Sequence, residues 1–113
     1  MVLAHGLPEW RQCGSELADM VVKLLLTDDE PTKALQTAET ELQRAWRAGS
    51  EAGKASALRL VARVQLARGK STQALAWATE AQTIARQAGN VRCEAAVLWQ
   101  MSEVHRRRRH NEK

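Results

Sequence analysis

The sequence contains no phenylalanine and no tyrosine, and its 113 residues include only two prolines and two cysteines. Without Phe and Tyr, the core must be built from Leu, Ala, Val and four Trp, and few β-branched or aromatic residues remain for a sheet. The chain is rich in Ala, Leu, Gln, Glu, Lys and Arg, which favour helices. We therefore predict an all-α protein, and the length suits a single domain.

A long apolar run and a recognisable leader are also missing. The most apolar stretch, MVVKLLL at residues 20–26, is too short to cross a membrane and carries Lys23. Two cysteines in a chain of this size are typical of a reducing compartment rather than a disulfide scaffold. We expect an intracellular protein without membrane insertion, located in the cytoplasm, or in an organelle if a targeting peptide has been removed.

The charges are unevenly distributed along the chain. Residues 1–54 contain six Lys and Arg against nine Asp and Glu, whereas residues 55–113 contain eleven against four. The net charge of +4 is therefore the sum of −3 in the first half and +7 in the second. This asymmetry indicates a partner at one end of the molecule rather than a uniformly basic coat for nucleic acid.

A repeat of 40 residues organises the chain. It aligns TKALQTAETELQRAWRAG (32–49) with TQALAWATEAQTIARQAG (72–89), and the register continues from residues 55–68 to 95–108. Apolar residues at helical spacing predict helices over 15–28, 32–48, 55–68, 72–88 and 92–108. Short connections make neighbouring helices antiparallel, so we predict a short solenoid of helical hairpins with about five helices.

The repeat also suggests how the chain is divided. Residues 1–14 would be an N-terminal extension and residues 109–113 a basic and polar tail. The repeat domain, residues 15–108, would contain units at about 15–54 and 55–94 and a half-repeat at 95–108. Pro31 suits a first helical turn and Ser71 an N-cap, while Gly49 and Gly89 suit the left-handed residue that ends a helix.

Gly69-Lys70-Ser71 matches the last three residues of a phosphate-binding loop. Such a loop also needs a glycine five residues before its Gly-Lys pair, and that position is Val64. The four intervening residues fall on a predicted helix rather than a glycine-rich turn. We therefore interpret Gly69-Lys70-Ser71 as a turn between helices and expect no nucleotide or other cofactor.

The segment ALRLVARVQLARGKSTQALAWATEAQTIA (57–85) resembles the helix-turn-helix consensus of the tetratricopeptide (TPR) repeats. The period and the ending IARQAGN (84–90) are similar to the longer variant found in kinesin light chains and LGN-type polarity scaffolds. The resemblance covers residues 15–108. It implies a solenoid that binds other proteins, and it places Asp19, Arg59 and Trp99 at equivalent positions on the concave face.

No arrangement of residues indicates catalysis or a metal site. His5, His105 and His110 lack metal-ligand spacing, and four arginines between the last two would repel a cation. Cys13 and Cys93 occupy the same repeat position two units apart, too distant for a disulfide. We predict no catalytic, cofactor or metal residues and no enzymatic activity.

The tryptophans have different expected roles. Trp46 and Trp77, on second helices of the repeats, should fill the core between helices, and Trp10 could cap the N-terminal end. Trp99 is a candidate binding residue, with a core position as its alternative. Leu58 and Leu75 should be buried in the repeat cores.

The predicted partner site lies on the concave face and at its C-terminal end. The candidate residues are Lys23, Arg59, Arg63, Trp99, Met101, Glu103, Arg106 and Arg107. We expect Ala95, Leu98, Met101 and Val104 to pack back onto helix 72–88. Because no helix follows, Val97, Trp99 and Met101 would form an apolar patch with a basic rim.

The leading functional hypothesis is a protein–protein interaction adaptor or scaffold, a small subunit or docking module of a larger assembly. The expected partner is a protein that offers an apolar surface flanked by acidic residues. Self-association is the competing account, because the acidic half of one copy could meet the basic half of another. An RNA-binding repeat module that uses HRRRRH (105–110) is the alternative function, although these arginines also suit a solvated helix C-terminus.

Overall fold

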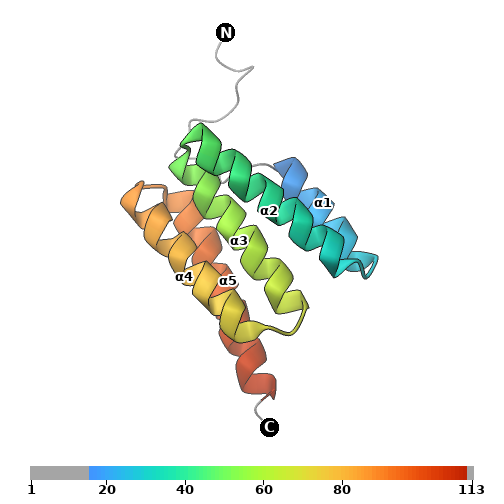
Figure 1. Cartoon of the computed structure of the whole chain (residues 1–113). Coiled ribbons are helices and arrows are strands. Elements are labelled where there is room, and N and C mark those ends of the chain that lie inside the picture. Colours follow the sequence, from blue (N-terminus) through green and yellow to red (C-terminus); the bar gives the residue numbers. More distant parts are fainter. Residues whose placement is uncertain (1–15, 112–113) are drawn as a thin grey trace.

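The computed structural model describes residues 16–111, which form five helices and no strand (Figure 1). The helices are α1 (Glu16–Thr27), α2 (Pro31–Ala48), α3 (Glu51–Ala67), α4 (Ser71–Gln87) and α5 (Val91–Asn111). This confirms the predicted all-α class. The predicted extension at residues 1–14, with His5, Trp10 and Cys13, lies outside the described residues.

The helices follow one another as antiparallel hairpins. Helices α1 and α2 form the first hairpin, α3 and α4 form the second, and α5 packs against the second hairpin (Figure 1). Helix α3 contacts each of the other four helices and is the centre of the fold. Because α3 also touches α1 and α5 directly, the first helices of successive hairpins lie next to one another. The result is a solenoid-like array of helical hairpins.

All four turns between successive helices place a residue in the left-handed region, and two of them follow the prediction. Gly49 and Gly89 each have φ of 68° just after α2 and α4, where a side chain would be strained. Asp29 has φ of 60° and lies one repeat before Gly69, which has φ of 80°. Aspartate is one of the few residues that tolerate this conformation, so the same turn is built from different residues in the two hairpins.

The helix boundaries depart from the prediction in three places, and a capping residue explains the largest departure. The Ser50 hydroxyl accepts a hydrogen bond of 3.0 Å from the Gly53 N–H, so α3 begins at Glu51, four residues before the predicted start. The prediction of Ser71 as an N-cap is wrong, because Lys70 occupies that position and makes no side-chain cap bond. Pro31 is the first residue of α2, as predicted. Helix α5 continues to residue 111, past its predicted end.

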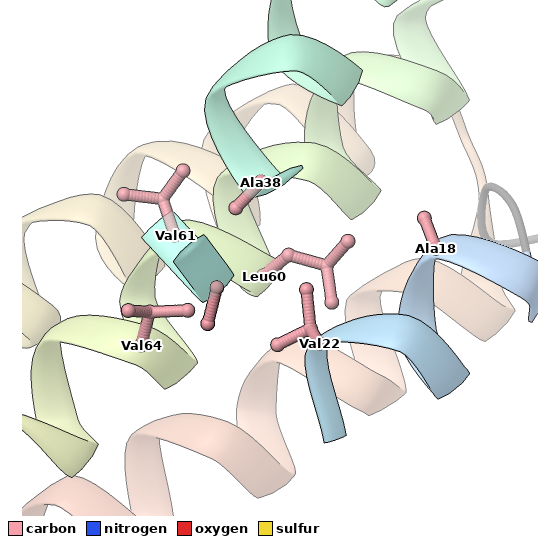
Figure 2. Close-up of a cluster of buried hydrophobic side chains, with 7 residues drawn as sticks. Ala18, Val22, Ala38, Leu60, Val61 and Val64 are labelled. Atoms are coloured by element: carbon pink, nitrogen blue, oxygen red, sulfur yellow. The ribbon is translucent and has the colours of Figure 1, made fainter. Parts of the chain in front are cut away.

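The core is made from alanines of the second helices packed against larger residues of the first helices. Figure 2 shows one such cluster, in which Val22 of α1 and Leu60 of α3 meet below Ala38 of α2. The buried alanines are Ala34, Ala38 and Ala45 in α2 and Ala74, Ala78, Ala81 and Ala85 in α4. Small side chains let neighbouring helices approach closely, which keeps the core dense without Phe or Tyr.

The burial of the tryptophans was only partly predicted. Trp77 is half-buried and packs against two core clusters, as expected. The prediction for Trp46 is wrong, because its side chain is 55% exposed and lies under the Lys54 ammonium, 4.2 Å from the ring centroid. Trp46 follows Ala45, and one residue along a helix turns the side chain by about 100°, away from the alanine stripe.

Candidate functional site

A groove of about 600 Å³ lies between α1, α3 and α5, the first helices of successive hairpins. Two rows of repeat-equivalent residues cross it. Lys23, Arg63 and Glu103 form one row, and Thr27, Ala67 and Arg107 form the other. Because members of a row are 40 residues apart, each repeat contributes one residue to each row. The groove is therefore a direct product of the repeat.

An ion pair beside the groove joins α1 to α3. Arg59 Nη2 donates to both Asp19 carboxylate oxygens, at 3.3 Å to Oδ1 and 3.2 Å to Oδ2. Arg63 Nη1 lies 3.9 Å from Asp19 Oδ1, so one carboxylate orients two guanidinium groups. Asp19 and Arg59 are repeat equivalents, and the pair shows that successive first helices make contact in register.

The groove is positively charged. Its lining includes four cationic residues, Lys23, Arg59, Arg63 and Arg107, and one carboxylate, Glu103. Within the described part of the chain, Lys23 and Arg107 form no ion pair. Glu103 accepts hydrogen bonds from Arg106 Nη2 at 2.6 and 2.8 Å, which offsets its charge. These cations favour an acidic ligand.

Trp99 provides the apolar element of the groove. Its side chain is 69% exposed, and it lines the groove next to Gln100 of the same helix. The ring stands one repeat after Arg59. An exposed tryptophan is a favoured anchor for protein contacts because it offers a large, rigid surface. The core alternative for Trp99 therefore does not hold.

The structure brings together most of the predicted site residues. Lys23, Arg59, Arg63, Trp99, Glu103 and Arg107 all line the groove. Arg106 is exposed beside the groove, where it holds Glu103. Met101 lies on another face of α5, where it packs against a buried cluster that includes Leu58 and Val97.

The predicted apolar patch on α5 is wrong in its orientation. Val97 has 0% exposure and Met101 is half-buried, whereas Ala95 and Leu98, expected to pack against α4, are exposed. Val104 is buried as expected. The helix presents residues 93, 97, 100 and 104 to the core, a stripe about one residue away from the predicted one.

Sequence reasoning missed the row of Thr27, Ala67 and Arg107 as a group, and it missed the apolar floor of Leu26 and Leu66. The signal was available in the repeat. Each of these residues lies three or four positions, about one helical turn, after Lys23, Arg63 or Glu103, which were already assigned to the concave face.

The described residues contain neither a metal-binding cluster nor a helix that could span a membrane. Among residues 16–111 there is no group of three His, Cys, Asp or Glu side chains placed to hold a metal ion. None of the described helices has the length and apolar character to cross a bilayer. Cys93 is buried, and its Sγ lies 3.8 Å from the Ala52 carbonyl oxygen.

Gly69 and Lys70 lie in the turn between α3 and α4, Ser71 is the first residue of α4, and α3 remains helical through Ala67. We predict that Lys70→Ala changes the free energy of unfolding by less than about 0.5 kcal/mol, because Lys70 is exposed. The wild-type protein should not bind ATP or GTP in equilibrium dialysis. Saturable nucleotide binding that Lys70→Ala abolishes would contradict this interpretation.

No protein-family model, curated protein or solved structure matches the chain.

Proposed function

We propose that this chain is a non-enzymatic adaptor of the TPR type, and that its groove binds an acidic segment of another protein. The observation that carries the proposal is the placement of Lys23, Arg63 and Arg107 around one groove with Trp99 at its side. Such an adaptor would serve as a docking module or small subunit of a larger assembly.

The charges suggest how a partner segment would lie. Lys23 comes from α1, Arg63 from α3 and Arg107 from α5, so carboxylates spaced along an extended segment could meet cations from each helix. An apolar side chain of the same segment would pack against the exposed ring of Trp99. The volume of about 600 Å³ falls in the range typical of ligand sites, about 300–1,000 Å³.

RNA binding is the alternative function, and the exposed arginines of the last turns of α5 favour it. Single-stranded RNA is usually held by several aromatic rings that stack on successive bases. Within the described residues, Trp46 and Trp77 lie on α2 and α4, whereas the groove is formed by α1, α3 and α5. The groove thus offers one ring, Trp99, which favours a protein partner.

The proposal predicts that reversing two groove charges abolishes most binding. The variant Lys23→Glu with Arg107→Glu should weaken binding of a fluorescent Glu- and Leu-rich peptide at least about tenfold, roughly 1.4 kcal/mol. These two cations form no ion pair among the described residues, so their loss should leave the helical circular dichroism intact. Fluorescence anisotropy would measure the affinity.

A matched control separates the groove from net charge. Arg47→Glu with Arg92→Glu changes the net charge by the same amount at exposed positions outside the groove lining. Equal losses in the two double variants would overturn the groove as the binding site. If a labelled single-stranded RNA binds more tightly than the peptide and loses affinity steeply with salt, the RNA alternative replaces the adaptor proposal.

A further inference from the structure

Helix α3 is buried on two faces, one toward each neighbouring hairpin. Leu60 and Val64 pack against α1 and α2, in a cluster with Val22 and Ala38. On the other side, Leu58 packs against residues of α4 and α5. In a repeat, the same two faces occur on α1 and α5, but among residues 16–111 each of those helices has a neighbouring hairpin on one side only.

The first face is uncovered on α1. The residues one repeat before Ala57, Leu60 and Val64 are Leu17, Met20 and Leu24. Their exposures are 71%, 59% and 62%, whereas the residues one repeat later, Val97, Gln100 and Val104, are at most 7% exposed. Helix α1 thus carries large apolar residues on the face that the repeat buries everywhere else.

The second face is uncovered on α5. The residues one repeat after Ala55, Leu58, Ala62 and Leu66 are Ala95, Leu98, Ser102 and Arg106, and all four are exposed. Leu98 is 47% exposed, although its equivalent Leu58 is 1% exposed. The two ends of the array therefore present two different open faces, one on α1 and one on α5.

Charges beside the two open faces are complementary. Asp28 and Asp29 follow α1, and Arg108 and Arg109, their repeat equivalents two units later, lie near the end of α5. Within the described residues none of these four side chains forms an ion pair. If α1 of a second copy lay beside α5 in register, its Asp28 and Asp29 would lie near the arginines at the end of α5. Of these, Arg109 is exposed and lies one turn after Arg106 on the outer face.

We propose that α1 of one copy of this chain docks on the outer face of α5 of a second copy, head to tail. The in-register Asp19–Arg59 pair between α1 and α3 is the precedent for such contacts. Leu98 would pack among Leu17, Met20 and Leu24, and the acidic turn would meet the arginines. Pairing of like faces in the same parallel register is disfavoured, because α1 with α1 brings acidic turns together and α5 with α5 brings arginines together.

Because the two faces differ, the contact is heterologous and does not close in a dimer. The wild-type protein should form oligomers whose mean mass, measured by sedimentation velocity, rises with concentration and falls with added salt. Met20→Lys with Leu24→Lys blocks the α1 face, and Leu98→Glu with Arg109→Glu blocks the α5 face. All four positions lie outside the buried core, so both variants should keep the wild-type helical circular dichroism.

The decisive experiment mixes the two variants. Each variant alone should be monomeric, and the mixture should form a dimer of one copy of each that does not grow further. The intact α5 face of the first variant would then hold the intact α1 face of the second. A monomeric wild type, a mixture that stays monomeric, or self-association of either variant alone would overturn the proposal.

Discussion

Leu58→Ala is expected to lower the free energy of unfolding by about 2–5 kcal/mol. The Leu58 side chain is 1% exposed and belongs to the cluster that joins α3 to Ala78 and Ala81 of α4 and Val97 of α5. Truncation would leave a cavity beside alanines, whose side chains are too short to move into it. The loss is a large share of the roughly 5–15 kcal/mol that stabilises a typical domain. Urea denaturation followed by circular dichroism would measure it.

The repeat supplies a matched control at the equivalent position of α5. Leu98 is 47% exposed, so Leu98→Ala should cost less than about 1 kcal/mol at protein concentrations too low for self-association. Leu75, also predicted to be buried, is only half-buried, and Leu75→Ala should fall between the two. Equal losses for Leu58→Ala and Leu98→Ala would mean that α5 is covered on both sides, contrary to the structure.

The architecture could be predicted because equivalent helices and turns recur along the sequence. Gly49 and Gly89 end equivalent helices, and alanines recur at equivalent positions of α2 and α4. The start of α3 was harder to predict, because apolar periodicity does not reveal a capping residue. The Ser50 hydroxyl extends α3 by four residues that the apolar pattern left out.

Groove residues were predicted where they share a repeat position. The prediction failed on α5, where it had to choose which side of the helix faces the core. Lys23, Arg63 and Glu103 share one repeat position, and all three line the groove. On α5, the apolar residues at 95, 97, 98, 101 and 104 fit more than one stripe, and helical spacing alone cannot choose between them. The register does choose, because Leu98 is equivalent to Leu58, which packs toward the following helix.

The alanine stripe of α4 should tolerate added side-chain volume poorly. Ala78→Leu is expected to lower the free energy of unfolding by about 1–3 kcal/mol, even though leucine is the more hydrophobic residue. Ala78 has 0% exposure and belongs to the same cluster as Leu58, Ala62 and Val97. Three extra carbons there must push α4 away from α3 or force side chains out of their preferred rotamers.

Ala76→Leu is the control for Ala78→Leu, because Ala76 is exposed on the same helix. Both changes leave helix propensity nearly unaltered, so the difference between them reports packing alone. We expect Ala76→Leu to change the free energy of unfolding by less than about 0.5 kcal/mol. Stability in Ala78→Leu equal to or above that of the control would show that α3 and α4 are loosely packed.

Close packing of α4 on α3 also positions α5, which rests on both helices and carries Trp99 and Arg107. The same variant should therefore weaken binding of the acidic peptide, although Ala78 itself does not line the groove.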